Sequence, residues 1–293
     1  MPYEKASTIM DQCRRLGAEY LTFVGGEPTL HPDLPRLVER ANELGYRKVM
    51  IDSNGLSIKQ LLDVNPRELY YVRISLDGAT AATHEKVRGP DTYQKTVASV
   101  RELVPLGYRV RITYTVFNFN THELPDMLSL AQSLAVTLVN IHSFSEEGLG
   151  RAHPDWSLTP EQWMAFCEEL EALKPKFEIP VRYPPTWVRP ENLPKYTDRG
   201  FRGCLGCSVD RLSIFPDGRC YICSLLFDTA LNFGVMTDNG FVLNRGSNEY
   251  ELFTKAAMGA PEPALMGCPA EASLGAVPHN DFVSVCRLWR TPA

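Results

Sequence analysis

The chain has 293 residues, of which 44% are hydrophobic and 22% are charged, and these values are ordinary for a folded globular protein. Its formal net charge of -5 provides no basic surface for a phosphate backbone. No apolar run approaches the roughly 20 residues that a membrane-spanning helix needs, and the N-terminal residues lack the charged-then-apolar layout of a secretory signal. The sequence therefore predicts a cytoplasmic protein that binds neither nucleic acid nor membrane.

Helix and strand patterns alternate through the first half of the chain. Apolar residues at helical spacing predict a first helix over residues 6–16, which Gly17 ends. Predicted strands then cover residues 20–24, 48–52, 70–76, 109–117 and 136–142, and predicted helices cover 32–44, 57–63, 92–106 and 121–134. Strands that alternate with helices imply a parallel sheet with right-handed crossovers. We expect an α/β fold with five parallel strands, as an open sheet or part of a barrel, in which a first strand is missing.

The pattern changes after residue 143. Thr159-Pro160-Glu161-Gln162 has the form of a capping box with proline at the first helical position, and it predicts a helix to about Leu173. Residues 182–196, RYPPTWVRPENLPKY, carry four prolines and predict a linker. We therefore divide the chain into an α/β part (1–145), a helix with a proline-rich linker (146–196) and a cysteine-rich part (197–293).

Polar residues follow several of the predicted strands. The first predicted strand runs into Gly25-Gly26-Glu27-Pro28, the second into Asp52-Ser53-Asn54-Gly55 and the third into Ser75-Leu76-Asp77-Gly78, while later strands end near Asn118 and His142. Each group alone is an ordinary turn, because these residue types favour turns. The carboxyl ends of parallel strands meet at one edge, where ligands bind. Together the groups predict a site for a polar ligand that bears an amine and hydroxyls.

Cysteines are concentrated in the last third of the chain. Cys13 and Cys167 stand alone, and the other six are Cys204, Cys207, Cys220, Cys223, Cys268 and Cys286. In the cytoplasm such a set indicates metal or redox chemistry before disulfides. Two C-x-x-C pairs flank RLSIFPDGR, which predicts a strand and a Pro-Asp-Gly turn that folds the second pair back toward the first. Thiolates in this arrangement can hold either a structural zinc ion or an iron–sulfur cluster.

The segments FVGGEPTLHPDL, IDSNG, ISLDG…HEKVRG and CSVDRLSIFPDG…C together resemble the radical S-adenosylmethionine (radical SAM) enzymes, over nearly the whole chain. The C-terminal part resembles their SPASM/twitch auxiliary-cluster branch. The resemblance implies a partial parallel (β/α) barrel that binds S-adenosylmethionine. Gly25, Gly26, Glu27 and Pro28 would receive the methionine amino group, Ser53, Asn54, Ser75 and Asp77 would lie along the ribose and carboxylate, and the backbone near Asn140–His142 would meet the adenine.

The resemblance also assigns the cysteines. Cys207, ten residues, Gly218, four residues and Cys223 match the family spacing, with Cys204 as the upstream ligand and Cys268 as the distant fourth. Cys220 and Cys286 would be spare or alternative ligands of this auxiliary 4Fe-4S cluster. The C-x2-C-x5-C-x3-C run of full SPASM domains is absent from the sequence, which favours the one-cluster twitch form.

One departure from the family pattern concerns the 4Fe-4S cluster that cleaves S-adenosylmethionine. Its C-x3-C-x2-C motif does not occur here, and the cysteine ahead of GGEP, Cys13, lies at helical spacing on an apolar face. Either the sequence is truncated at its N-terminus or the protein is a degenerate relative. We expect truncation, because the polar strand ends are otherwise intact.

The leading functional hypothesis is a radical SAM enzyme that forms a 5′-deoxyadenosyl radical and abstracts hydrogen from a small polar substrate. Sugars, aminocyclitols and nucleosides in natural-product or cofactor biosynthesis are the substrate types that the one-cluster form implies. Electrons would come from a reductant such as flavodoxin or ferredoxin. A SPASM-type peptide maturase is the second hypothesis, and a non-catalytic metal-binding protein that docks a partner is the third.

Overall fold

The computed structural model describes residues 1–146, 148–184, 186–189, 191, 211–223, 226–227, 229–246, 248 and 283–284. The chain divides into two compact units. The first contains residues 1–144, 155–157 and 166–183, and the second contains residues 145–154, 158–165 and 184–293. The three-part division expected from the sequence stays a prediction. Within the described ranges, no helix is long and apolar enough to cross a membrane.

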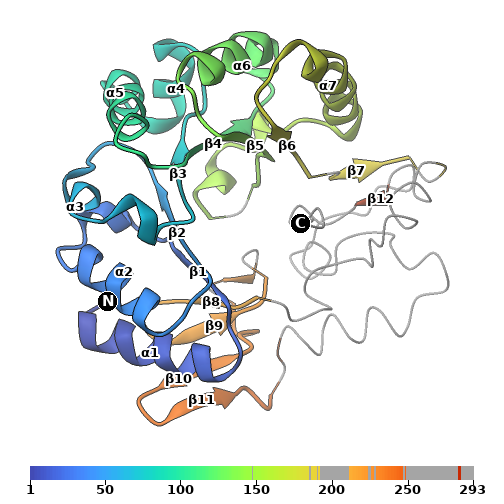
Figure 1. The fold of residues 1–293 in the computed structure, drawn as a ribbon. Helices are drawn as coiled ribbons and strands as arrows, with labels where there is room; N and C mark the ends of the chain where they lie inside the picture. The colour runs from blue at the N-terminus through green and yellow to red at the C-terminus, as the bar shows by residue number, and fades with distance from the viewer. Residues whose placement is uncertain are drawn as a thin grey trace. The chain divides into compact units, whose positions relative to one another are not determined.

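A six-stranded sheet is the centre of the first unit, and its strands follow one another in chain order from β1 to β6 (Figure 1). All neighbouring strands are parallel. The strands are β1 (Tyr20–Phe23), β2 (Lys48–Ser53), β3 (Tyr71–Ser75), β4 (Val110–Val116), β5 (Leu138–Ser143) and β6 (Val181–Arg182). The five predicted strands are confirmed. The sixth, β6, was not predicted, because two residues before a proline-rich segment carry too little alternation to be recognised.

Helices connect the strands and lie along one side of the sheet (Figure 1). They are α1 (Tyr3–Arg15), α2 (Leu34–Glu43), α3 (Lys59–Leu62), α4 (Ala81–Arg88), α5 (Tyr93–Leu103), α6 (Leu124–Ser133) and α7 (Pro160–Leu173). Short 3-10 turns complete the set: η1 (Pro28–Leu30), η2 (Pro66–Glu68), η3 (Thr121–Glu123), η4 (Gly148–Ala152), η5 (Pro154–Trp156) and η6 (Lys174–Lys176). The predicted helices are confirmed, whereas α4 was not foreseen.

The capping box of α7 forms as its sequence predicts. The Thr159 backbone N–H donates to Gln162 Oε1 at 2.9 Å, and the Gln162 N–H donates to Thr159 Oγ1 at 3.3 Å. The two residues satisfy one another's main-chain donors at the point where the helix begins.

The two faces of the six-stranded sheet differ in chemistry. Side chains at alternate positions, such as Val72, Ile74 and Ile112, are fully buried and form the core with the helices. The intervening positions of the same strands carry polar or charged residues, among them Arg73 and Arg111. Parallel strands that are covered on both faces are usually apolar throughout. We call the second face the inner face, and its polarity indicates that it is not a conventional hydrophobic core.

The second unit contains antiparallel strands. One sheet has the order β11-β10-β9-β8, and a two-stranded sheet pairs β12 with β7. The strands are β7 (Trp187–Val188), β8 (Ser213–Ile214), β9 (Arg219–Tyr221), β10 (Gly234–Thr237), β11 (Gly240–Leu243) and β12 (Val283–Ser284).

The predicted Pro-Asp-Gly turn joins β8 to β9. Gly218 has φ +97°, and a Cβ at this position would lie 2.5 Å from the Met236 carbonyl oxygen. Both facts restrict the position to glycine, because other residues rarely adopt a positive φ and no side-chain atom would fit.

Candidate functional site

The loop after β1 presents open backbone. Gly25 has φ +81° and Gly26 has φ +50°, and a Cβ built on either residue would meet no atom within 4 Å. Both glycines are exposed, whereas Pro28 is buried at the start of η1. The positive φ angles explain why glycines occupy these positions, and the empty surroundings leave their peptide groups accessible to a ligand.

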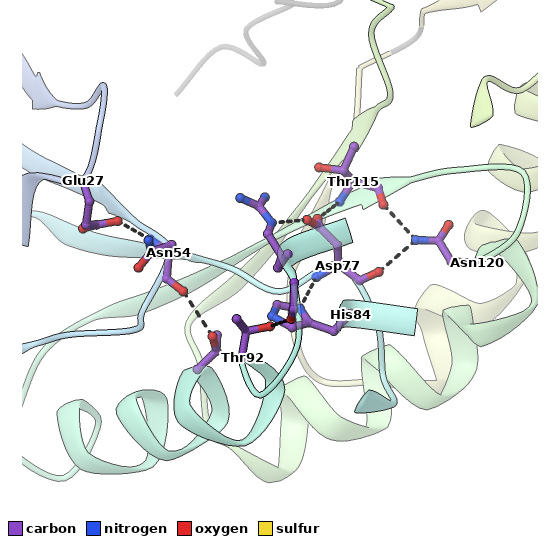
Figure 2. Close-up of polar contacts among 10 residues, drawn as sticks. Glu27, Asn54, Asp77, His84, Thr92, Thr115 and Asn120 are labelled. Atoms are coloured by element: carbon purple, nitrogen blue, oxygen red, sulfur yellow. Dashed lines mark hydrogen bonds and ion pairs between the residues drawn. The ribbon is translucent and has the colours of Figure 1, made fainter. Parts of the chain in front are cut away.

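Glu27 connects this loop to the end of the neighbouring strand. Its Oε1 accepts hydrogen bonds from the Thr29 backbone N–H (3.1 Å) and the Thr29 hydroxyl (2.6 Å), and its Oε2 accepts one from the Asn54 backbone N–H (2.7 Å; Figure 2). The side chain is half-buried. An ionised carboxylate has about four acceptor positions, so these three bonds fix its orientation and leave capacity for one further donor.

The loop after β2 is held mainly by its own hydrogen bonds. Ser53 is buried, and its hydroxyl accepts the Gly55 backbone N–H at 3.0 Å. Asn54 Oδ1 accepts the Leu56 N–H at 2.8 Å, and the Asn54 carbonyl accepts the Thr96 hydroxyl of α5 at 3.1 Å. The structure thus brings Asn54 to Glu27 as the sequence suggested, while the Ser53 side chain is engaged within the turn.

Asp77 lies in the loop after β3 and has no exposed surface. Its Oδ1 accepts the Thr115 backbone N–H at 2.8 Å, and its Oδ2 accepts the Arg88 Nε–H at 2.6 Å (Figure 2). Its carbonyl accepts the Asn120 side-chain N–H at 3.0 Å. The carboxylate therefore joins β3, α4 and β4. Ser75, two residues earlier on the inner face, is partly exposed.

His84 of α4 holds the same loop by a hydrogen bond to its backbone. The Asp77 backbone N–H donates to His84 Nδ1 at 3.1 Å, so the neutral ring carries its proton on Nε2. Burial, as the largest cause, lowers the pKa of His84. Next to Asp77, a Cβ on Gly78 would lie 2.5 Å from the backbone nitrogen of His84, so only glycine allows the loop to approach α4 this closely.

Glu123, at the end of η3, supplies a second buried carboxylate beneath this edge. Its Oε2 accepts the Ala79 backbone N–H at 2.7 Å, and its Oε1 accepts the hydroxyls of Thr80 (3.0 Å) and Thr83. Neither Glu123 nor Asn120 was predicted from the sequence. The available signal was their position just after the polar end of the predicted strand 109–117.

His142 is an exposed residue of β5 and pairs with Thr115 of β4 in the sheet register. The protein packed around its ring lowers the pKa of His142, and the Arg73 charge adds to this effect, while the Asp77 charge opposes it. Solvent reaches the side chain. The ring is therefore neutral at pH 7, and it can accept or donate a hydrogen bond at this edge.

The predicted metal ligands fall mostly outside the described residues. This holds for Cys204, Cys207 and Cys268, so the ligand set stays a prediction. Cys223 follows β9 and is buried, as is Cys220. In the part of the chain that the structure describes, no three His, Cys, Asp or Glu residues are grouped to hold a metal.

The lone N-terminal cysteine is not placed for metal binding. Cys13 lies on α1, and burial raises its pKa to about 11. It is therefore a protonated thiol at neutral pH, whereas thiolates are the metal-binding form.

The fold and this edge define a class of protein: a partial parallel (β/α) barrel with glycines, a carboxylate and a histidine gathered at the carboxyl ends of its strands. Residues 1–131 match the family model of the radical SAM superfamily. This part of the chain is similar to radical SAM domains.

Two curated proteins illustrate the sequence similarity. A probable GTP 3',8-cyclase of Saccharolobus islandicus is 25% identical over 225 residues, covering 75% of this chain and 71% of that protein. The protein of the same name from Sulfolobus acidocaldarius is 27% identical over 226 residues, covering 75% and 70%.

Solved structures share the fold. The structure of anSMEcpe with bound AdoMet aligns with a TM-score of 0.67 at 16% identity, over 90% of this chain and 73% of that one. Streptococcus suis SuiB bound to S-adenosylmethionine aligns with a TM-score of 0.65 at 15% identity, over 78% of this chain. The chain spans about half of SuiB, 55% of its length. The predicted fold class, a partial parallel (β/α) barrel followed by a cysteine-rich C-terminal part, is confirmed. The C-terminal part contains an antiparallel sheet, which was not predicted, and Cys220 lies on its strand β9.

Proposed function

We propose that this chain is the S-adenosylmethionine-binding and auxiliary part of a radical SAM enzyme that acts on a small polar molecule. The observation that carries the proposal is the Glu27 loop, in which a half-buried, oriented carboxylate with acceptor capacity left stands beside two open glycines. The match of residues 1–131 to the superfamily supports it independently.

The residues of the first unit fit S-adenosylmethionine in part. Glu27 can accept from the methionine ammonium group, and the peptide groups of Gly25 and Gly26 are open to its approach. His142 is accessible to a second part of the ligand. Asp77 and Ser53 are buried and engaged, so we assign them the role of positioning the loops rather than touching the ligand. When bound beside a reducing cluster, S-adenosylmethionine supplies a 5′-deoxyadenosyl radical.

The residues present do not fit the cluster that cleaves S-adenosylmethionine. Such a cluster needs about three or four thiolates. The sequence contains no C-x3-C-x2-C motif, and Cys13 is one protonated thiol on a helix.

Substrate size is the part of the proposal on which the comparisons diverge. The curated relatives are named as cyclases of GTP, a small polar molecule, and they support the small-substrate proposal. SuiB has also been solved with its precursor peptide SuiA, which supports peptide maturation as a second candidate. A non-catalytic relative is the third candidate, and the missing motif is its support.

For the C-terminal third we propose an auxiliary 4Fe-4S cluster on Cys204, Cys207, Cys223 and Cys268. After anaerobic reconstitution, metal analysis should find about four irons per chain in addition to acid-labile sulfide. Cys223→Ser should lower the iron content, and Cys167→Ser, a cysteine of α7, is the matched control. About one zinc per chain without iron would overturn this assignment in favour of a structural zinc site.

Formation of 5′-deoxyadenosine tests the proposed activity. The 293-residue chain should form no 5′-deoxyadenosine when it is incubated with dithionite and S-adenosylmethionine. A version that carries a C-x3-C-x2-C segment ahead of Met1 should form it after reconstitution, at least slowly without substrate. Absence of product from a longer version with a loaded cluster would favour the non-catalytic candidate.

A further inference from the structure

Aromatic and basic side chains alternate along the amino ends of the first four strands. The row comprises Tyr20, the first residue of β1; Lys48, the first residue of β2; Tyr70, just before β3; and Arg109, just before β4. The register is continuous, because Tyr20 pairs with Lys48 and the Tyr70 N–H donates to the Val49 carbonyl. We call these four residues the amino-edge patch. It lies at the opposite ends of the strands from the candidate site.

The Tyr70 ring holds several cations close together. Lys48 Nζ lies 4.5 Å from the centroid of this ring, and Arg109 Cζ lies 4.5 Å from it. Lys48 Nζ is also 4.8 Å from the Tyr20 centroid, and Cζ of Arg111 on β4 is 5.5 Å from the Tyr70 centroid. A cation is attracted to the electron-rich face of an aromatic ring. The two tyrosines therefore hold in place charges that repel one another.

Neighbouring carboxylates do not neutralise this positive charge. Among the residues that the structure describes, none of the three cations around Tyr70 forms an ion pair. Glu19, which precedes the patch, is paired with Arg47 at 2.8 Å. The patch is thus locally basic on a chain whose formal net charge is -5.

The patch is accessible, and its potential is positive. Tyr20 is 41% exposed, Arg109 is exposed, and Lys48 and Tyr70 are half-buried. The Lys48 charge is the largest cause that lowers the pKa of the Tyr70 phenol, and the Arg111 and Arg109 charges lower it further, against a small opposing effect of burial. A nearby positive charge favours an anion at the phenol, and the same charge favours an anion supplied by a partner.

We propose that the amino-edge patch docks an acidic protein partner, through an extended segment whose carboxylates meet Lys48 and Arg109 on either side of the Tyr70 ring. Neighbouring strands are about 4.8 Å apart, so a row over four strands is about 14 Å long, the length of four or five extended residues. Tyrosine and arginine are enriched in protein interfaces. A nucleic acid would instead bring a dense row of phosphates against a chain of net negative charge.

Calorimetric titration of the full chain with an octaglutamate peptide tests the proposal at low ionic strength. We expect binding whose affinity falls steeply as salt is added, because exposed charges are screened. A single-stranded oligonucleotide of equal charge is titrated under the same conditions and should bind more weakly. Absence of peptide binding, or tighter binding of the oligonucleotide, would overturn the proposal.

Charge variants locate the surface. Lys48→Gln and Arg109→Gln should each weaken peptide binding about 2- to 5-fold, the usual range for an exposed ion pair. Lys59→Gln is the matched control, because Lys59 is exposed and begins α3, beyond the carboxyl end of β2. Equal affinity in the wild type and both patch variants, or an equal loss in Lys59→Gln, would contradict the assignment.

Ring variants test the role of Tyr70. Tyr70→Phe keeps the aromatic face that holds the two cations and should bind the peptide like the wild type. Tyr70→Leu removes that face and should weaken binding about 2- to 5-fold, because Lys48 and Arg109 lose their fixed positions. A similar affinity in Tyr70→Leu and Tyr70→Phe would show that the ring does not organise the patch.

Discussion

The loops after β1 and β3 carry similar residues but have different surroundings. Both place a carboxylate beside glycine just after a parallel strand, as Gly26-Glu27 and Asp77-Gly78. Glu27 is half-buried, with exposed glycines next to it, whereas Asp77 has no exposed surface. Gly25 has empty space where a side chain would be, and Gly78 has the backbone of α4 there.

This difference separates ligand contact from support. A carboxylate that orients itself with three hydrogen bonds and stays accessible can meet a positively charged ligand. A carboxylate whose oxygens bind Arg88 and the Thr115 backbone instead fixes the relative positions of α4 and β4. We therefore expect changes at Asp77 to act on stability, and changes at Glu27 to act on binding.

The largest stability effect is expected for Asp77→Asn. The change preserves the shape of the side chain but removes the anion from the Arg88 pair, so the free energy of unfolding should fall by about 3–4 kcal/mol, as for breaking a buried ion pair. Urea denaturation of the full chain measures it. Asp63→Asn, at an exposed position, is the control and should change stability by less than about 0.5 kcal/mol. A similar small loss for both variants would show that Asp77 does not support the edge.

The next largest effect is a difference in stability between alanine variants of the glycines in the two loops. Gly78→Ala would place a Cβ 2.5 Å from the backbone nitrogen of His84, and this overpacking should lower the free energy of unfolding by about 2–3 kcal/mol. Gly25→Ala meets no atom and should cost about 1 kcal/mol, from its positive φ alone. The two unfolding curves would contradict the comparison if Gly25→Ala were the more destabilised protein.

The smallest effect concerns the pH dependence of stability. Burial lowers the pKa of His84 in the folded protein below its ordinary 6.5, so below that pH the unfolded chain binds more protons than the folded one. Stability should therefore fall as the pH drops below 6.5 and until the folded pKa is reached. His84→Gln should remove this component, at most about 1.4 kcal/mol per pH unit, and His122→Gln, at an exposed position, should retain it. Parallel profiles for wild type and His84→Gln would contradict the account.

Much of the fold followed from the sequence, because periodic apolar positions and end signals act locally. The five longer strands, the capping box of α7 and the Pro-Asp-Gly turn were all predicted and are confirmed. Helix α4 and strand β6 were missed, since eight residues and two residues carry little periodicity. Both elements are specified by tertiary contacts, α4 through Asp77 and Arg88, and β6 through its register with β5.

The candidate site was less predictable, because residue type does not reveal burial. GGEP correctly indicated an accessible loop, but Ser53 and Asp77 looked equally available in the sequence and are engaged inside the protein. Nor could the sequence show that Arg73 is neutralised by Asp52 while Arg111 Nε has no hydrogen-bond acceptor among the described residues, since both facts depend on register across three strands.

The affinity of Glu27→Gln for S-adenosylmethionine tests the central claim most directly. In a chain that carries the C-x3-C-x2-C segment ahead of Met1, the change replaces a carboxylate by an amide of the same shape. Calorimetry should show binding weakened by about 1–3 kcal/mol, the range for a hydrogen bond to a charged group, while urea unfolding shows a smaller loss than for Asp77→Asn. Unchanged affinity, or a stability loss equal to that of Asp77→Asn, would make Glu27 a supporting residue and contradict the account.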